Sequence, residues 1–326
     1  MASLHERIYA VSPIPVQNAL VTMYGRKLHR QRYGPAYHAA FEHYSTKDYS
    51  RGDAEREVQR TELLRLLRHA KENSPFYRAL YADVDLDAIR GVEDLHRLPV
   101  VEKEQLRAAI DSVMTLRPEE GIEAFTGGTT GKSLKIVYTG DDFQTRMAYL
   151  DAFKVRCGVE PHGARKATFS GRSMATGVFQ GRNGPFWRDN RAYNQRLYST
   201  FDLRPETLPV YVADLNRFQP DVLNGFVSAL HQLATYVVDH GVRLSFRPKA
   251  IFTTSETLLP FHREIIERAF GARIYDQYAS AEGAPFITEC THRRLHYNID
   301  TGVIEAMDYG AAVSYTHLTL RTILLV

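Results

Sequence analysis

Glycines, threonines and one lysine are concentrated in the stretch FTGGTTGKS, residues 125–133. Glycine permits backbone angles that turn successive N–H groups toward one point, and such a concave arrangement binds anions. Threonine hydroxyls add neutral donors, and Lys132 adds a flexible cation. The stretch therefore predicts a phosphate-binding loop, and the alternative is a flexible turn that has no ligand.

The spacing argues against a Walker A loop, which needs a glycine, four residues and then Gly-Lys-Ser/Thr between a strand and a helix. Only three residues separate Gly127 from Gly131. The residues that follow, SLKIVYT, are rich in β-branched and aromatic types and predict a strand, so no helix N-terminus awaits the phosphate. We expect a loop that joins two strands.

Strand and helix patterns alternate between about residues 164 and 278, which predicts an α/β fold with a largely parallel sheet flanked by helices. Ligands of such sheets bind at the carboxyl ends of the strands. The predicted ends are residues 224–226, 253–256 and 278–282, and the last two contain the segments TTSETL and YASAEG.

The first hundred residues are predicted to be mostly helical. In residues 53–75, apolar side chains recur at helical spacing, and Ser74-Pro75 ends the pattern. The apolar face is predicted to contain Val58, Leu63, Leu66, Leu67 and Ala70.

Composition indicates a globular cytoplasmic protein, with 44% hydrophobic residues, a net charge of +3 and two cysteines in 326 residues. The sequence has no apolar run long enough for a membrane span, and nothing in it demands a nucleic-acid partner. Residues 25–34, GRKLHRQRYG, form a basic stretch. It is either a solvated helical face, which the pattern favours, or a contact for phosphates or an anionic membrane.

Taken in order, FTGGTTGKS, TTSETL and YASAEG resemble the motifs of the adenylate-forming enzymes, the acyl- and aryl-CoA synthetase superfamily. SPFYRAL, LPVVEKEQL and AEGAPFITEC add a resemblance to its phenylacetate–coenzyme A ligase-like branch, including proteins of capsular polysaccharide biosynthesis. The resemblance extends from about residue 5 to about residue 308.

The resemblance implies roles for individual residues. The ATP phosphates would be held by Thr126, Gly127, Gly128, Thr129, Thr130, Gly131 and Lys132. The residues implied near the adenine are Ser255, Glu256, Asp276 and Tyr278, and the carboxylate pocket would include Asn224, Phe226, Val227 and Ala279. Glu282 would hold Mg²⁺, and Thr130, Lys132 and Glu282 would be catalytic.

Each role has a plainer alternative. Lys132 could remain in solvent, Tyr278 could pack in the core, and Glu282 could be an ordinary loop acid. Ala279 stands where the family more often has glycine, and Val227 where it more often has proline, which alters the expected pocket shape.

In the family, a carboxylate attacks the α-phosphate of Mg·ATP, and a thiol, usually coenzyme A, then captures the acyl group. The resemblance thus implies ATP, Mg²⁺, coenzyme A and a small carboxylic acid, with the identity of the acid and the oligomeric state left open. The alternatives are an adenylating transferase acting on a sugar amine or hydroxyl in surface polysaccharide biosynthesis, and an inactive nucleotide-binding scaffold.

The resemblance assigns residues 1–310 to the large AMP-binding N-terminal domain, with a helical region over about 1–110. Family members continue into a mobile lid domain that carries a catalytic lysine. The ending AAVSYTHLTLRTILLV resembles vector-derived sequence instead. We therefore expect residues 311–326 to be a non-native tail, the lid to be missing and turnover to be low.

The sequence gives little support to two other kinds of site. Cys290, His292 and His296 in ECTHRRLHYN are zinc-ligand types, but no Cys-x-x-Cys pair accompanies them, which favours a structural turn. The sequence has no Gly-x-Ser-x-Gly elbow, which argues against a Ser-His-Asp hydrolase.

Overall fold

The structure, a computed structural model, describes residues 4–47, 52–125, 134–171, 184–281, 283, 285–307 and 319–322. The chain divides into two compact units. The first comprises Met1–Ser45, Gln144–Gln277 and Thr288–Leu295, and the second comprises Thr46–Phe143, Tyr278–Ile287 and His296–Val326.

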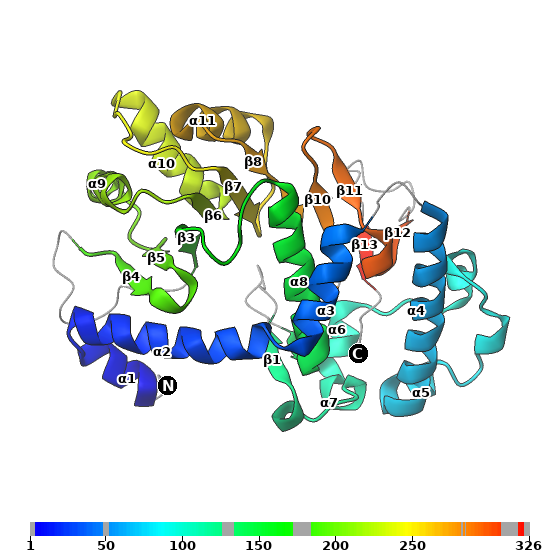
Figure 1. The fold of residues 1–326 in the computed structure, drawn as a ribbon. Helices are drawn as coiled ribbons and strands as arrows, with labels where there is room; N and C mark the ends of the chain where they lie inside the picture. Colours follow the sequence, from blue (N-terminus) through cyan, green and yellow to red (C-terminus); the bar gives the residue numbers. More distant parts are fainter. Residues whose placement is uncertain are drawn as a thin grey trace. The chain divides into compact units, whose positions relative to one another are not determined.

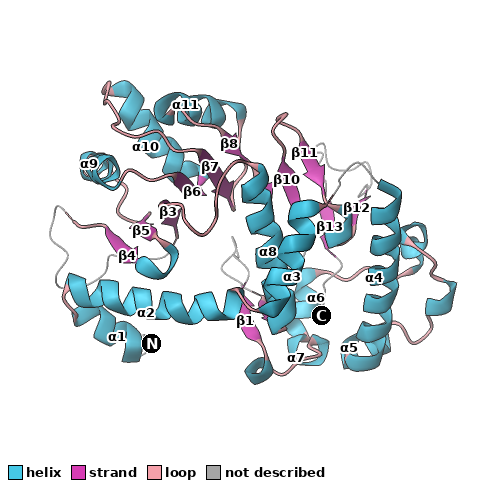
Figure 2. Ribbon diagram, viewed as in Figure 1, coloured by secondary structure: helices cyan, strands magenta, loops and turns pink. Residues whose placement is uncertain are grey.

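The first unit is built on a six-stranded sheet of order β4-β5-β3-β6-β7-β8 (Figures 1 and 2). All neighbouring strands are parallel except β4 and β5. The strands are β3 (Lys166–Ser170), β4 (Trp187–Asn190), β5 (Gln195–Ser199), β6 (Val222–Phe226), β7 (Ala250–Thr254) and β8 (Ile274–Tyr275). The prediction of a largely parallel α/β fold is confirmed.

Successive residues of the central strands face two different apolar layers. Leu223 and Ile251 pack with α9 (Leu208–Phe218), α10 (Val227–Asp239) and α11 (Pro260–Phe270). Val222 and Phe252 pack in the other layer, with Phe153 of α8 (Gly140–Arg156). Because both faces are covered, these strands are almost continuously apolar, as parallel strands usually are.

Helix α2 (Ile14–Arg32) covers the edge strand β4. Asn18 Oδ1 accepts a hydrogen bond from the Asp189 backbone N–H at 3.0 Å, and Thr22 Oγ1 accepts one from Arg191 N–H at 3.2 Å. Glycine allows this close approach, because a Cβ at Gly25 would lie 2.2 Å from Asn190 Oδ1. The helix occupies an edge that would otherwise be open to another strand. Helices α1 (Leu4–Val11) and α3 (Pro35–Thr46) flank α2 in the sequence.

The second unit contains a helical core and two hairpins. Its helices are α4 (Gly52–Asn73), α5 (Pro75–Leu80), α6 (Lys103–Ala108) and α7 (Ile110–Val113). Strands β1 (Ile122–Phe125) and β2 (Lys135–Tyr138) are antiparallel, as are β12 (Ile304–Met307) and β13 (Thr319–Thr322). A further small sheet of order β11-β10-β9 belongs to neither unit alone, because the residues of each strand are divided between the two. Its strands are β9 (Gln277–Tyr278), β10 (Ile287–Glu289) and β11 (Leu295–Tyr297).

The predicted helix over residues 53–75 is present as α4, with Leu63, Leu67 and Ala70 in the core. The prediction for Val58 is wrong, because its side chain is 48% exposed. It lies five residues before Leu63 and so falls off the stripe formed by Leu63, Leu67 and Ala70. Within the described residues, no helix is both long and apolar enough to cross a membrane.

Candidate functional site

The predicted phosphate loop and the predicted magnesium ligand lie outside the described residues. These positions are Thr126, Gly127, Gly128, Thr129, Thr130, Gly131 and Lys132, together with Glu282. Their roles stay predictions, and the structure describes the segments that lead into and out of them.

The loop connects two paired strands. Phe125 of β1 lies opposite Lys135 of β2, and the antiparallel register continues to Ile122 opposite Tyr138. Lys135 forms a 2.5 Å ion pair with Glu123 across the hairpin. The prediction that a strand follows the loop is confirmed. Among the described residues, the chain enters β2 directly after Leu134, without the helix that a Walker A loop requires at this point.

Tyr138 links this hairpin to the YASAEG segment. Its hydroxyl donates a hydrogen bond to the backbone carbonyl of Ala281, and both residues belong to the second unit. Ala281 directly precedes Glu282, and β2, which carries Tyr138, begins two residues after the loop. The base of the glycine–threonine hairpin and the acidic motif are therefore neighbours within one unit.

Tyr278 and Ala279 are both exposed, and Tyr278 retains 38% of its surface. The core-packing alternative for Tyr278 is therefore wrong. Tyr278 thus presents part of its aromatic side chain at the surface, next to the acidic motif.

In the first unit, several predicted residues gather at the carboxyl ends of β6, β7 and β8. Phe226 lies opposite Thr254, and Gly225 lies opposite Thr253. Asp276 follows β8, and its Oδ1 accepts hydrogen bonds from Thr253 Oγ1 at 3.1 Å and from the Gln277 backbone at 2.9 Å. Burial raises the pKa of Asp276, and these two hydrogen bonds oppose the increase.

Strands β6 and β3 approach closely at Gly225. A Cβ at Gly225 would lie 2.7 Å from the backbone oxygen of Phe169 on β3, so only glycine fits there. Asn224 and Phe226, the predicted pocket residues on either side, are both partly exposed. Their predicted contact with a carboxylate substrate stays a prediction.

Ser255 and Glu256 form a turn beyond β7. Ser255 has a left-handed backbone, with φ of 66°. The carboxylate of Glu256 accepts hydrogen bonds from the Ser228 backbone N–H at 2.7 Å and the Ser228 hydroxyl at 2.9 Å. Ser228 is in the first turn of α10, so Glu256 caps that helix and opposes its positive end. Contact of these residues with adenine stays a prediction.

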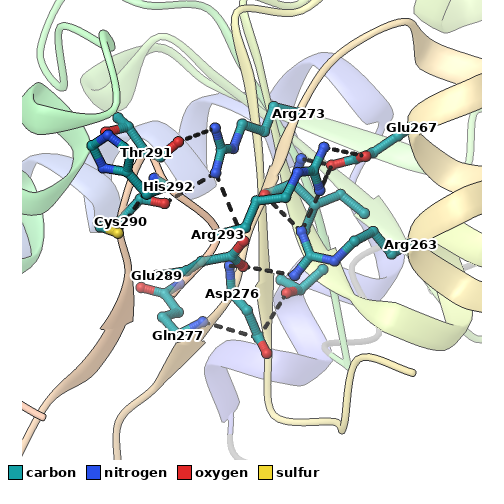
Figure 3. Close-up of polar contacts among 12 residues, drawn as sticks. Arg263, Glu267, Arg273, Asp276, Gln277, Glu289, Cys290, Thr291, His292 and Arg293 are labelled. Atoms are coloured by element: carbon teal, nitrogen blue, oxygen red, sulfur yellow. Dashed lines mark hydrogen bonds and ion pairs between the residues drawn. The ribbon is translucent and has the colours of Figure 1, made fainter. Parts of the chain in front are cut away.

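The buried carboxylate of Glu289 holds together the two ends of the segment between β8 and β10, which contains YASAEG (Figure 3). Glu289 is 2% exposed, and its Oε2 accepts hydrogen bonds from Arg263 at 2.7 Å and from the Asp276 backbone N–H at 3.0 Å. The Glu289 backbone N–H donates in return to the Asp276 carbonyl at 2.9 Å. The chain is therefore clamped where it leaves β8 and again where it returns at β10.

A second ion pair lies beside this clamp. Arg293 donates to both carboxylate oxygens of Glu267, at 3.1 and 2.9 Å, and Glu267 Oε1 also accepts from the Ile274 backbone (Figure 3). Burial alone would raise the pKa of Glu267, but these hydrogen bonds outweigh burial and lower it. This second ion pair fixes the start of β8, at Ile274, to the turn that follows β10.

Cys290 takes part in this turn. Its Sγ accepts a hydrogen bond from the His292 backbone N–H at 3.3 Å. Among the residues that the structure describes, no three His, Cys, Asp or Glu side chains are grouped as metal ligands. A zinc site at Cys290 and His296 therefore gains no support.

Sequence reasoning missed Tyr138, Arg263 and Glu289. Tyr138 was included in a predicted strand, but its partner Ala281 is far along the chain and has no distinctive side chain. A charged residue on an amphipathic helix, such as Arg263, is ordinarily assigned to solvent.

No family model matches this chain. It is 34% identical over 299 residues to Protein CapK of Staphylococcus aureus, covering 91% of this chain and 65% of CapK. It is also 32% identical over 130 residues to a phenylacetate–coenzyme A ligase of Thermus thermophilus, covering 39% of this chain and 28% of the ligase. The chain thus spans less than two thirds of these curated relatives.

Solved structures agree on the fold. The structure of 2-hydroxyisobutyryl-CoA ligase in the postadenylation state with 2-HIB-AMP matches with a TM-score of 0.59 and 18% identity, covering 79% of this chain and 56% of the ligase. The same ligase with 2-HIB-AMP and CoA matches with a TM-score of 0.58, covering 82% and 58%. The sequence relatives and the shared fold together establish that this chain belongs to the adenylate-forming superfamily, in the group that contains CapK and the phenylacetate–coenzyme A ligases.

Proposed function

We propose that this chain forms the nucleotide-binding part of an ATP-dependent ligase. The ligase converts a carboxylic acid to an acyl-adenylate and then to a coenzyme A thioester. The hydrogen bond from Tyr138 to Ala281 is the observation that carries the proposal. It supports the view that the hairpin loop and Glu282 act on the same nucleotide.

In the first step, a carboxylate oxygen forms a bond to the α-phosphorus of ATP while the bond to the pyrophosphate oxygen breaks. Negative charge from two reactants converges in this transition state, so preplaced donors lower the barrier. We assign that task to the backbone N–H groups and hydroxyls of residues 126–131 and to the Lys132 ammonium.

Glu282 is our proposed ligand for Mg²⁺. Mg²⁺ commonly takes one or two carboxylates and completes its shell with substrate phosphates and water. One protein acid beside a triphosphate loop is therefore sufficient, and a cluster of protein ligands is not required.

In the second step, the sulfur of a thiol bonds to the acyl carbon, the bond from that carbon to the AMP oxygen breaks, and the thiol loses its proton. Coenzyme A is the thiol that the ligase relatives favour. In the first unit, Asn224 and Phe226 would contact the acid. In the second unit, the exposed Tyr278 would contact the nucleotide. We expect these 326 residues to bind MgATP.

Calorimetric titration with MgATP tests this function. The wild-type chain should bind MgATP, and Thr130→Ala and Lys132→Ala should each weaken binding about tenfold or more, as expected for one lost donor to a charged phosphate. Lys249→Ala, at an exposed lysine of the first unit, is the matched control and should leave affinity unchanged. Equal affinity in all four proteins would refute a phosphate-binding loop.

The acceptor is tested separately in a chain extended to the length of CapK. Acid-dependent exchange of pyrophosphate into ATP reports the first step, and thioester formation with coenzyme A reports the second. Exchange without thioester would favour a sugar amine or hydroxyl as acceptor, and MgATP binding without exchange would favour an inactive scaffold.

A further inference from the structure

The outer face of α2 combines exposed apolar side chains with cations. Val16, Met23, Lys27 and Arg30 are separated by seven, four and three residues, which places them on one side of a helix. The opposite side contains Gln17, Thr22 and Gly25, which are buried. The stripe of four residues is thus the side that faces away from β4.

The apolar part of this surface is unusually open. Val16 is 45% exposed, Met23 is 63% exposed and Tyr24 is 54% exposed. Helix α1, which precedes α2 in the chain, also has exposed apolar side chains, with Ile8 49% and Val11 62% exposed. Exposure of apolar side chains to water is unfavourable, and covering them with another surface lowers the free energy.

The charged part is entirely positive. Arg26, Lys27 and Arg30 are exposed, and within the part of the chain that the structure describes none of them forms an ion pair. The sequence has no Asp or Glu from Arg7 to Phe41. The overall charge of the protein is only +3, so this positive field is local to α2.

We propose that the outer face of α2, together with α1, docks on an anionic lipid bilayer. The cations would contact phosphate head groups, while Val16, Met23 and Tyr24 would enter the boundary between head groups and acyl chains. Helix α2 lies in the bilayer plane in this arrangement, since its other side remains packed on β4. Nucleic acid satisfies the charges but offers no apolar layer for Met23 and Val16, so the bilayer fits both features.

Flotation of the full chain with vesicles tests the proposal. Vesicles of phosphatidylcholine with about a third phosphatidylglycerol should carry the protein, pure phosphatidylcholine vesicles should carry far less, and binding should fall as salt rises. The triple variant R26Q/K27Q/R30Q should weaken binding about tenfold or more, given the attraction of each cation to an anionic surface. Val16→Ser with Met23→Ser should weaken it at every salt concentration.

The matched control is R204Q/R243Q/K249Q, which removes three exposed cations of the same unit elsewhere on the surface and should bind like wild type. Thermal unfolding of each variant verifies that it is folded. Equal loss in the control and α2 variants, or equal binding to neutral vesicles, would overturn the proposal. Sedimentation measures self-association in the absence of vesicles. If the α2 variants change self-association and the wild-type protein does not bind vesicles, the face is a contact between copies of the chain and the proposal is overturned.

Discussion

The hydroxyl of Tyr138 donates a hydrogen bond to the backbone carbonyl of Ala281, joining the hairpin that carries the glycine–threonine loop to the residue before Glu282. The two residues are distant in sequence but belong to the same compact unit. The bond fixes the base of the loop against the acidic motif, which is the relation that a shared nucleotide requires.

Removing this hydroxyl should therefore affect affinity more than folding. We predict that Tyr138→Phe lowers the free energy of unfolding by only about 1 kcal/mol, the usual worth of one hydrogen bond. MgATP binding should weaken several-fold, because the loop and Glu282 are no longer held together. Tyr297→Phe is the control, since its hydroxyl donates to the Gly302 carbonyl at 2.6 Å in the same unit. Similar affinity losses in both variants would contradict the specific role of Tyr138.

The clamp of Glu289 should be important for stability. Glu289→Ala removes the buried carboxylate that accepts from the Arg263 guanidinium and from the Asp276 N–H. Arg263 retains the Ile274 carbonyl and Glu267 as partners. Loss of one partner of a buried ion pair costs about 3–5 kcal/mol, and we expect a decrease of that size in denaturant unfolding. Glu57→Ala, which removes an exposed pair with Arg60, should have a far smaller effect. A Glu289 variant as stable as the Glu57 variant would show that the clamp is not formed.

Glu256 is predicted to act as a helix cap. Glu256→Ala should destabilise the protein by about 1 kcal/mol, because the Ser228 N–H at the start of α10 loses its acceptor. Glu256→Gln retains an acceptor oxygen and should lose only part of this stability. MgATP affinity measured on both variants separates the cap from an adenine contact, since a cap alone leaves affinity unchanged.

Deprotonation of Lys166 should make the free energy of unfolding increase with pH. Burial lowers the pKa of this lysine from 10.5 to about 8, and its Nζ donates to the Tyr193 carbonyl at 3.1 Å. Between these two pKa values the unfolded chain binds more protons than the folded chain, so the contribution of Lys166 to stability increases as pH rises through this window. Denaturant unfolding across it should show a rise for wild type that is missing in Lys166→Met. Lys249→Met, at an exposed lysine, should retain the rise.

The sequence was sufficient for the parts of the fold that repeat a pattern. The predicted alternation over residues 164–278 is present as β3, β6, β7 and β8, with α10 and α11 between the last three strands. The last predicted strand end, at residues 278–282, is wrong, because β8 ends at Tyr275 and Gln277–Tyr278 form the separate strand β9. Strands β4 and β5 and helices α8 and α9 were not predicted. Strand β4 contains Arg188 and Asn190 at its buried positions, since α2 rather than an apolar layer covers it. A strand whose buried residues are polar shows no alternating apolar pattern, so the sequence does not reveal it.

For the candidate site too, the sequence predicted the local motifs and not the contacts between distant segments. Motif order led to the loop and to residues 278–283, which are short and local. The Glu289–Arg263 and Tyr138–Ala281 contacts join segments that meet only after folding, and no local pattern marks them. The capping role of Glu256 was also not predicted, because it depends on where β7 ends relative to the start of α10.

The central claim is that the hairpin loop and Glu282 bind the same nucleotide, and a double-mutant cycle on MgATP affinity tests it most directly. The proteins are wild type, Thr130→Ala, Glu282→Gln and the double variant. Residues that share one ligand network show coupling of about 0.5–3 kcal/mol, and we predict a value in this range. Losses that simply add, to within about 0.3 kcal/mol, would mean that the two positions act independently and would contradict the proposed site.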